Sequence, residues 1–465
     1  MDLTQGPLGP LLLRLAWPVV VSMLLNQLLG VIDLLFVKRL GDTAATAAVG
    51  ISTFATFLVI NLLVGLGIGT SALVARRTGE GNQEAAQEVV RQSCYLMAVL
   101  SLVLGAGLAL AADPMLDALG QSAAVRHYAV PFIQIYAGSF VIGMQTIVFR
   151  STMQGLGDTL TPTLLLLLAN GINALLDWLL VTGVGPFPRM EVAGLAVGTA
   201  VAQIVQVAIY LHLLRGGRYF SLRTGQGWTP GWRRYPYHLR FPGFQLLPDV
   251  LRGIWAIGWP TGMQGVLRSF AFLILMRFAG RTDIGDKAVA AFTAGMNAEG
   301  IAFLPVVGVS FAVVSLVGQN LGAGSPERAE RAAVLGGRVA FLYLLVMCVV
   351  FLVWNEELIG LFLDRSDVQA IHSGAWYLYL TGFAEWSLYV IALAGALRAS
   401  GDARFPFVVQ MVGQYLLRLP LAWALLEYTT WDSIGLWVAV NVSMVLEALA
   451  IHWRFAQGKW KTKKI

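Results

Sequence analysis

Long apolar segments are the feature that most constrains this chain. Twelve runs are each long enough to cross a bilayer, which takes ~20 residues of helix. They cover approximately residues 11–37, 46–75, 92–112, 128–152, 160–183, 192–214, 251–278, 287–317, 333–354, 371–397, 405–426 and 433–455. Because the runs are continuous rather than alternating, they predict helices and not barrel strands. The expected fold class is an all-α polytopic membrane protein.

The composition excludes a soluble fold of this size. Hydrophobic residues make up 57% of the 465 residues and charged residues only 12%, against about 25% charged in soluble proteins. The net charge of +6 arises from loops beside membrane spans, so it does not indicate nucleic-acid binding. Both cysteines, Cys94 and Cys348, lie in apolar runs and predict neither a disulfide nor a metal site.

The positions of the basic residues predict the orientation. Most of the 32 Lys and Arg residues lie in the loops on the same side as both termini. The positive-inside rule therefore places the N- and C-termini in the cytoplasm. The C-terminal lysines are expected to lie against anionic membrane lipids. They are Lys459, Lys461, Lys463 and Lys464.

Short patterns of the first half recur in the same order in the second half. Trp17-Pro18 matches Trp259-Pro260, Gly79 matches Gly322, Gly157-Asp158 matches Gly401-Asp402, and Gly194-Leu195 matches Gly435-Leu436. We therefore expect an N-terminal lobe over 1–214, a cytoplasmic linker over 215–250 and a C-terminal lobe over 251–465. Each half has six spans, an even number, so a pseudo-two-fold axis along the membrane normal relates the lobes. Asp158 and Asp402 are expected to cap the spans that follow them.

Four motifs give the chain a family resemblance. They are LVGQNLGAG at 316–324, QGLGDT at 154–159, ALRASGD at 396–402 and RLPLA at 418–422. With these motifs in this order, the chain resembles the multidrug and toxic compound extrusion (MATE) transporters over essentially its whole length. The resemblance implies a 12-helix, two-lobed antiporter that exports cationic or amphipathic organic compounds in exchange for H⁺ or Na⁺ by alternating access. It also implies a monomer without cofactor or enzymatic activity, in a prokaryotic cell (inner) membrane.

Acidic residues inside the spans point to a cation site in the first lobe. Asp33 and Asp177 lie ~6 and ~9 Å below the outer ends of their spans at 1.5 Å per residue. Asn26 shares a helix face with Asp33, and Asn173 shares one with Asp177. Thr199 reaches a similar depth in the sixth span. Hard cations prefer such an all-oxygen set, and two close carboxylates in a low dielectric share a proton or a cation.

The resemblance supports the same assignment. In the DinF-like branch, which we favour, an Asp in the first span and an Asn-x-x-x-Asp in the fifth form the coupling site. Asp33 and Asn173 to Asp177 match this pattern, and Thr199 matches it more loosely. If the ion is Na⁺, the expected ligands are Asp33, Asn173, Asp177 and Thr199. The alternative for Asp33 is a solvated pair with Lys38 and Arg39.

Other polar and adaptable side chains are predicted to line a substrate cavity. Met and aromatic side chains can repack around varied ligands. The predicted lining is Glu299, Glu385, Gln203, Gln206, Met144, Met296 and Trp386. The alternative for the two glutamates is an ion pair with Arg268 or Arg418. Gln410, Gln414 and Arg418 form a polar stripe that faces either the cavity or the bundle interior.

Two other functions compete with drug transport. A flippase for a lipid-linked precursor has a related two-lobed fold, but it would carry several intramembrane arginines, and here only Arg268 and Arg418 lie far from the ends of their spans. An intramembrane enzyme would need convergent His, Ser or metal ligands, which the sequence does not indicate. The chain contains no Gly-x4-Gly-Lys-Ser/Thr sequence, so ATP is not expected to drive it directly.

Overall fold

The computed structural model describes residues 3–38, 41–221, 231–234, 239–240 and 243–463, and it is almost entirely helical. The first half contains α1 (Leu8–Lys38), α2 (Thr43–Gly79), α3 (Gln83–Ala118), α4 (Ala123–Gly138), α5 (Phe140–Gly143), α6 (Gln145–Gly155), α7 (Leu160–Thr182) and α8 (Val192–Leu214). The second contains α9 (Pro248–Ala279), α10 (Asp286–Gly322), α11 (Pro326–Val353), α12 (Asn355–Ile359), α13 (Val368–Ala384), η1 (Glu385–Tyr389), α14 (Val390–Ala399), α15 (Arg404–Met411), η2 (Val412–Arg418), α16 (Leu419–Tyr428), α17 (Asp432–Ala456) and η3 (Lys459–Thr462).

The predicted helical membrane fold is confirmed, but three spans expected to be continuous are broken. Within the described ranges, ten helices are long and apolar enough to cross a membrane, and an eleventh is the pair of helices on either side of Ser139, bent by 47°. The tenth span passes through the 3-10 turn η1, and the eleventh passes through the π-helix η2 just before Pro420. A proline removes one backbone donor and clashes with the preceding turn, so the helix widens there.

Equivalent turns confirm the internal repeat. Gly81 and Gly324 have φ of 72° and 70°, and Gly157 and Gly401 have φ of 83° and 85°. Glycine is favoured at these positions because a Cβ atom disfavours positive φ. The sequence repeat is therefore also a repeat of backbone conformation.

The two halves meet along a seam of close helix contacts that repeats by two-fold symmetry. A Cβ atom on Gly79 would lie 2.0 Å from the Gln319 carbonyl oxygen, and one on Gly322 would lie 2.1 Å from the Arg76 carbonyl oxygen. These two contacts are equivalent, because each joins the glycine of one repeat to the residue three before the glycine of the other. The pseudo-two-fold axis therefore passes between α2 and α10.

The same symmetry pairs α2 with α9 and α10 with α1. A Cβ atom on Gly65 would lie 2.2 Å from the Gly262 backbone nitrogen, while one on Gly308 would lie 2.5 Å from a methyl group of Val20. In the first contact two backbones meet, whereas in the second a backbone meets a side chain. The α2–α9 contact is therefore the closer one, and α1 is held less tightly than its counterpart α9.

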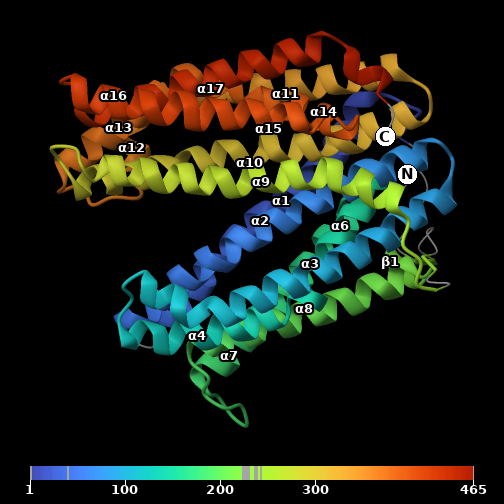
Figure 1. The fold of residues 1–465 in the computed structure, drawn as a ribbon, viewed down its shortest axis with the longest axis horizontal. Coiled ribbons are helices and arrows are strands. Elements are labelled where there is room, and N and C mark those ends of the chain that lie inside the picture. The colour runs from blue at the N-terminus through green and yellow to red at the C-terminus, as the bar shows by residue number, and fades with distance from the viewer. Residues whose placement is uncertain (1–2, 39–40, 222–230, 235–238, 241–242, 464–465) are drawn as a thin grey trace.

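The apolar core divides in the same way as the helices. One cluster contains residues of both halves, from Leu3 to Trp460, whereas two further clusters each belong to one half, over 37–196 and 275–440. Figure 1 shows the halves side by side at the end that carries both termini and diverging toward the end with α4 and α12. The lobes therefore share a core at one end only.

The glycine-rich motif at 316–324 supplies polar contacts across the seam. Gln319 donates to the Gly155 carbonyl oxygen at 2.9 Å and accepts from the Leu3 backbone nitrogen at 3.3 Å. Asn320 donates to the Leu3 carbonyl oxygen at 3.2 Å. The segment before α1 is thereby fixed against α10 of the other lobe.

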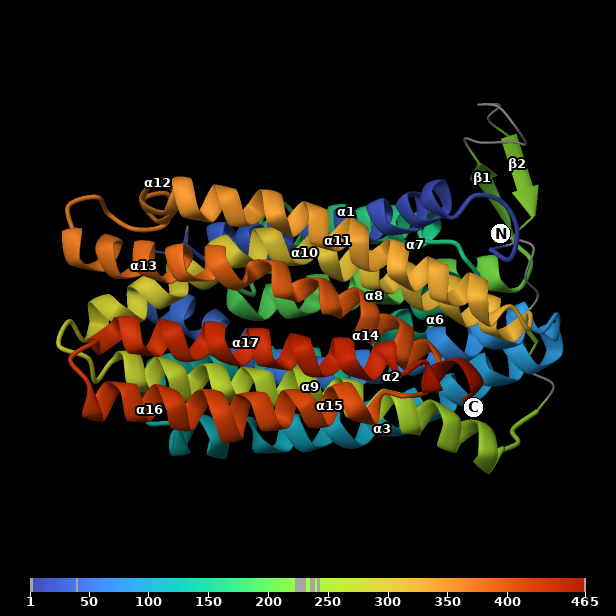
Figure 2. The ribbon, with the colours of Figure 1, turned by 90° about the horizontal axis from the view of Figure 1, so that it is seen from above.

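The segment between the lobes contains a short β-ribbon. Strands β1 (Arg218–Ser221) and β2 (Gly231–Arg234) pair antiparallel, with Arg218 opposite Arg234 in the backbone register. Figure 2 shows this ribbon projecting at the end of the molecule near the N-terminus. Further along, Gln92 of α3 donates to the Gln245 carbonyl oxygen at 2.6 Å and accepts from the Leu247 nitrogen at 3.2 Å. The approach to α9 is therefore anchored on the first lobe.

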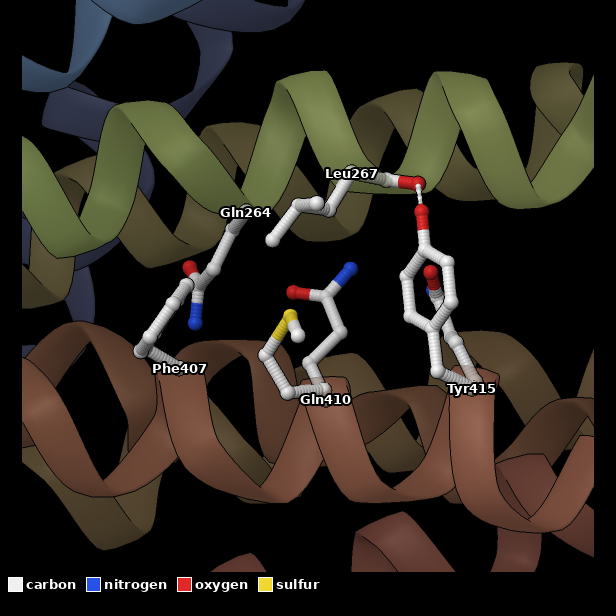
Figure 3. A pocket seen from close by; sticks show the side chains of 7 residues that line it. Gln264, Leu267, Phe407, Gln410 and Tyr415 are labelled. Atoms are coloured by element: carbon white, nitrogen blue, oxygen red, sulfur yellow. Dashed lines mark hydrogen bonds between the residues drawn. The ribbon is translucent and has the colours of Figure 1, made fainter.

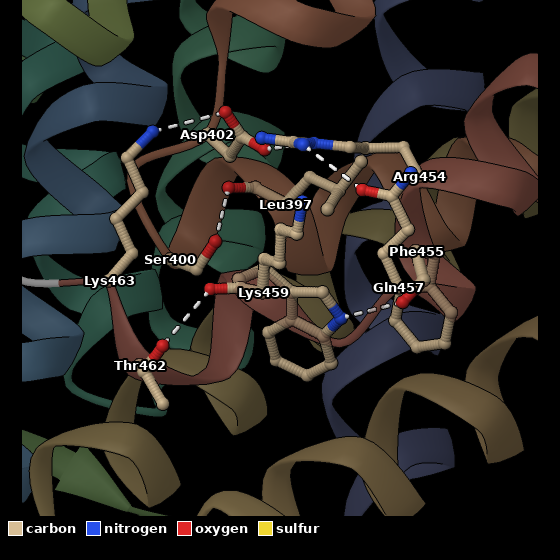
Figure 4. Close-up of polar contacts among 10 residues, drawn as sticks. Leu397, Ser400, Asp402, Arg454, Phe455, Gln457, Lys459, Thr462 and Lys463 are labelled. Atoms are coloured by element: carbon tan, nitrogen blue, oxygen red, sulfur yellow. Dashed lines mark hydrogen bonds and ion pairs between the residues drawn. The ribbon is translucent and has the colours of Figure 1, made fainter.

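The C-terminal tail packs on the second lobe, and its contacts correct one expectation. Asp402 accepts from Arg454 at 2.8 Å and from Lys463 at 3.0 Å (Figure 4), so it is the centre of an ion-pair network and not a helix cap. Lys461 pairs with Glu330 at 2.6 Å, so Lys461 and Lys463 both form ion pairs with the protein, while Lys464 lies outside the described residues. Asp158, in contrast, accepts from the Thr161 nitrogen at 3.0 Å, as a cap does.

The seam predicts that Gly262→Ala is destabilising. The added Cβ would lie 2.4 Å from the Leu62 carbonyl oxygen, and overpacking of this kind typically costs ~1–3 kcal/mol. We expect a lower melting temperature in a thermal size-exclusion assay. Gly107→Ala in α3 is the control, because a Cβ there has no neighbour within 4 Å and alanine favours helix. Equal melting temperatures for the two variants would contradict the seam.

Candidate functional site

Helix α7 binds α1 through polar side chains spaced seven residues apart. Thr163 donates to the Pro18 carbonyl oxygen at 2.8 Å, and Asn170 donates to the Leu25 carbonyl oxygen at 3.2 Å. Seven residues are about two helical turns, so the next position on this face, Asp177, also points at α1. The spacing was visible in the sequence, but the partners were not, because they are backbone groups of another helix.

At the third of these positions, Asp177 meets Asp33. The two carboxyl groups lie close enough to interact directly. Asp177 is fully buried. Asp33 Oδ1 and Asp177 Oδ2 are both buried and receive no donor from the described part of the chain. Two ionised carboxylates cannot share such a site without a counter-ion. A proton held between the oxygens, or a cation, supplies what is missing.

Asn173 and Thr199 complete the first layer around Asp177. The Thr199 hydroxyl donates to the Leu195 carbonyl oxygen at 2.9 Å, so its oxygen is free to accept. The Asn173 amide nitrogen then donates to Thr199 Oγ1 at 3.3 Å and to Asp177 Oδ1 at 3.2 Å. This arrangement fixes the amide orientation and leaves the buried Asn173 Oδ1 without a donor among the described residues.

The cluster therefore has more acceptors than donors. Its buried, unpaired oxygens come from Asp33, Asn173 and Asp177, and oxygen ligands of this kind suit H⁺ or a hard cation such as Na⁺. A Cβ on Gly198 would lie 2.4 Å from Asp177 Oδ1, so the glycine is what lets α8 approach the carboxyl group. In the described ranges, no group of three or more His, Cys, Asp or Glu side chains is placed to hold a metal ion.

A second layer includes one residue that sequence reasoning missed. Gln203 donates to the Tyr136 hydroxyl at 3.3 Å, and Tyr136 of α4 is close enough to Asp33 to interact electrostatically. Gln203 packs on Gly143, where α5 and α6 interrupt the fourth span. No periodicity connects Tyr136 with Asp33, because the two meet only through tertiary packing. Gln206 is buried one turn further along α8.

Two other first-lobe residues stand outside this cluster. Asn26 is exposed and makes no hydrogen bond within the described part of α1 and its neighbours, so no contact in the structure joins it to Asp33 and its predicted role stays a prediction. The alternative predicted for Asp33 is a solvated pair with Lys38 and Arg39. The side chain of Lys38 and the whole of Arg39 lie outside the residues that the structure describes. The contact that the structure does give Asp33 is the carboxyl group of Asp177.

The residues predicted to line a substrate cavity do not form one group. Glu299 accepts a hydrogen bond from the Tyr377 hydroxyl, which also contacts the Met296 sulfur at 3.2 Å. Glu385 is fully buried, and Met144 is 2% exposed in the shared core, so neither lines an open surface here. Sequence periodicity could not distinguish a core-facing position from a cavity-facing one.

Two further residues complete the second-lobe picture. Trp386 donates to the Phe383 carbonyl oxygen at 2.9 Å and packs edge-on against Phe341 of α11. Arg418 pairs with Glu447 at 3.6 Å and donates to Ser443 at 2.7 Å. Among the described residues, neither Arg268 nor Arg418 forms the alternative ion pair with Glu299 or Glu385, although both arginines act on Glu299 at longer range.

Two like-oriented helical repeats that share a core at one end define a two-lobed membrane transporter. The MatE family pattern matches residues 18–179 and 260–424, in both halves. The chain belongs to this family of transporters, as its motifs predicted, and it is not an enzyme.

Curated relatives match almost the whole chain. A probable multidrug resistance protein NorM of Thermotoga maritima is 26% identical over 98% of this chain and 93% of its own length. A protein of Shewanella oneidensis named FAD transporter is 26% identical over 97% and 95%. Identities this low across complete chains indicate a shared architecture, with room for different cargoes.

Solved structures show the same fold. A MOP superfamily transporter from Pyrococcus furiosus superposes with a TM-score of 0.86 at 21% identity, covering 100% of this chain and 98% of the other. An outward-facing MATE multidrug resistance transporter superposes with a TM-score of 0.82 at 22% identity, covering 98% of both chains. These MATE structures have the predicted twelve membrane helices in two lobes.

The carboxyl pair predicts a pH-dependent stability that Asp177→Asn removes. In the native protein, alkaline pH takes away the shared proton and leaves like charges facing each other, so the melting temperature should fall as pH rises at low Na⁺. In the variant, the amide supplies a donor to Asp33 at every pH, and the dependence should flatten. Thermal unfolding in detergent measures both.

The control for this experiment is Asp117→Asn. Asp117 is exposed and pairs with Arg126 on the surface, so this variant should keep the native pH response. A native response in Asp177→Asn would contradict the carboxyl pair as its origin.

Proposed function

We propose that this transporter exports organic solutes in exchange for H⁺ or Na⁺, and that Asp33, Asn173, Asp177 and Thr199 form the ion-coupling site. The observation that carries the proposal is the cluster of buried oxygens between α1, α7 and α8 that lack donors. A group of acceptors without donors is costly in a membrane unless a cation or proton joins it. Such a site is therefore ready to bind the driving ion.

The coupling step follows from the way α1 is held. Ion binding neutralises the carboxyl pair and joins α1 to α7 at Asp33. Loss of the ion restores repulsion at that end of the helix contact, while Thr163 and Asn170 still hold α1 further along. Helix α1 contains Pro18 and meets α10 through Val20 rather than through a glycine pair. It is thus the helix best able to bend or shift in response.

Alternating access would be a rocking of the lobes about the α2–α10 axis. The lobes diverge at the end away from the termini (Figure 1), and the positive-inside rule places the termini in the cytoplasm. The conformation described here would then face outward. Closing this end requires the seam at the other end to part, including the contacts of Leu3 with Gln319 and Asn320.

The cargo is proposed as a class of compound. Relatives carry the names multidrug resistance protein and FAD transporter, so an amphipathic organic solute fits both. A cationic solute would find Glu299 half-buried beside Met296, which is 37% exposed. Ion and solute must influence each other's affinity reciprocally if one drives the other.

The proposal predicts that Asp177→Asn uncouples transport. In proteoliposomes with an imposed H⁺ or Na⁺ gradient, gradient-driven movement of two xanthene dyes, tetramethylrhodamine ethyl ester and carboxyfluorescein, should fall at least about tenfold, within the usual range of coupling energies. Equilibrium binding of the dye that is transported should persist. Asp117→Asn is again the control. Undiminished gradient-driven transport by folded Asp177→Asn protein would overturn the coupling site.

A further inference from the structure

Two arginines in the interior of the second lobe lack a contacting acid. Arg268 stands near the middle of α9 and is exposed, with its guanidinium carbon 5.7 Å from the ring centre of Phe303. A guanidinium in lipid is costly, so this exposed side faces space between helices. In the described structure, neither Arg268 nor Arg398 has a carboxylate oxygen within ion-pair distance, unlike Arg418.

Arg398 is incompletely satisfied as well. Its hydrogen bond runs from Nη2 to Gln264 Oε1 at 3.5 Å, which is long, and its buried Nε has no partner among the described residues. Arg398 and Arg268 are near enough to repel each other electrostatically. Two like charges close together inside a lobe are stabilised by an anion between or beside them.

The acids of this lobe are engaged elsewhere. Glu447 pairs with Arg418, and Glu299 accepts from Tyr377. Glu385 is fully buried, with both oxygens unpartnered in the described part of the protein. Within the described residues, Arg268 and Arg398 therefore form no ion pair, and Glu299 acts on Arg268 only at longer range.

A narrow cavity adjoins Gln264. It is a gap between side chains that is partly open to the outside, and its empty space of about 140 Å³ includes open solvent. Its lining includes Gln264, Leu267, Phe407, Gln410, Gln414 and Tyr415 (Figure 3). The Tyr415 hydroxyl is already bonded to the Leu267 carbonyl oxygen at 2.7 Å, whereas the buried Gln414 Oε1 has no described partner. Side-chain amides are thus the polar groups still available in this wall, beside the two guanidinium groups.

We propose that this wall of the second lobe is a subsite for the acidic group of an amphipathic solute, either a carboxylate or a phosphate. Guanidinium groups bind such oxygens through charge-assisted hydrogen bonds. The amides of Gln264 and Gln410 add neutral donors, and the rings of Phe303 and Phe407 give an apolar body a surface to pack on. The proposal rests on the proposed function, because it names the class of cargo that this transporter carries.

The subsite deepens the functional proposal in one respect. The candidate ion site in the first lobe supplies acceptors and this wall of the second lobe supplies donors, so the driving cation and an anionic solute would bind to opposite lobes. The long-range attraction between them would then favour joint binding, unless the conformational change opposes it. The expectation of purely cationic cargo would be too narrow.

The test is equilibrium binding of two dyes with the same ring system but opposite charge. Carboxyfluorescein and tetramethylrhodamine ethyl ester are titrated by fluorescence anisotropy against the full chain in detergent without any ion gradient. Arg268→Gln and Arg398→Gln should each weaken carboxyfluorescein binding about tenfold, as for one lost charge-assisted hydrogen bond. Binding of the cationic dye should stay unchanged or strengthen.

Three controls separate this result from a folding defect and from the coupling proposal. Arg268→Lys keeps the charge and should retain more carboxyfluorescein binding than Arg268→Gln. Arg331→Gln removes an exposed charge on α11 and should change neither dye. Because no gradient is used, a failure of ion coupling at Asp177 leaves this test intact.

A final arm identifies the source of the anion. Reconstitution into phosphatidylcholine with or without phosphatidylglycerol shows whether an anionic lipid head group competes with carboxyfluorescein. Competition assigns the subsite to a lipid phosphate, and its absence assigns it to a soluble solute; both outcomes keep an anion site. Equal loss of both dyes in Arg268→Gln, or native carboxyfluorescein binding in both glutamine variants, would overturn the proposal.

Discussion

The close approach of α2 to α9 and α10 is the constraint on which the rest of the structure depends. Glycines at 65, 79, 262 and 322 remove the side chains that would keep these backbones apart. In a membrane, helices associate through such packing and through interhelical hydrogen bonds, because lipid removes most of the hydrophobic drive. The seam joins two lobes that otherwise have separate cores, so it is both the main contact between them and the axis about which they can move.

The symmetry of the seam is incomplete, and the incomplete part contains the candidate ion site. Where α9 offers Gly262 to α2, α1 offers Val20 to α10. Helix α1 is therefore packed less closely against the opposite lobe, while α7 holds it through side chains directed at its carbonyl groups. The carboxyl pair lies at the end of this attachment that is farther from the termini. The charge of the carboxyl pair can therefore influence the whole of α1, because α7 holds α1 along a single helix face.

The two lobes differ in the chemistry of their interiors, although their backbones repeat. Among the described residues, the first has a carboxyl pair whose buried oxygens lack donors, and the second has two guanidinium groups, those of Arg268 and Arg398, that form no ion pair. Duplication gave both halves the same turns and seam contacts, while their interior side chains diverged. The broken spans lie beside these interiors: Gly143 makes room for Gln203, and the π-helix η2 contains Gln414 and Arg418. Irregular helix is tolerated in a membrane where protein surrounds it.

By itself, the sequence determined the class of this protein, its repeat and the identity of the acidic pair. Hydropathy, glycine spacing and the Asn173 to Asp177 motif are local patterns, and local patterns can be read without coordinates. Only the tertiary structure decided that Tyr136 joins the site, that Asn26 does not, that Met144 and Glu385 are buried, and that Asp402 is an ion-pair centre. Each of these depends on which helix face meets which neighbour. A period of 3.6 residues marks a polar or apolar face, but it does not say whether lipid, core or cavity lies opposite.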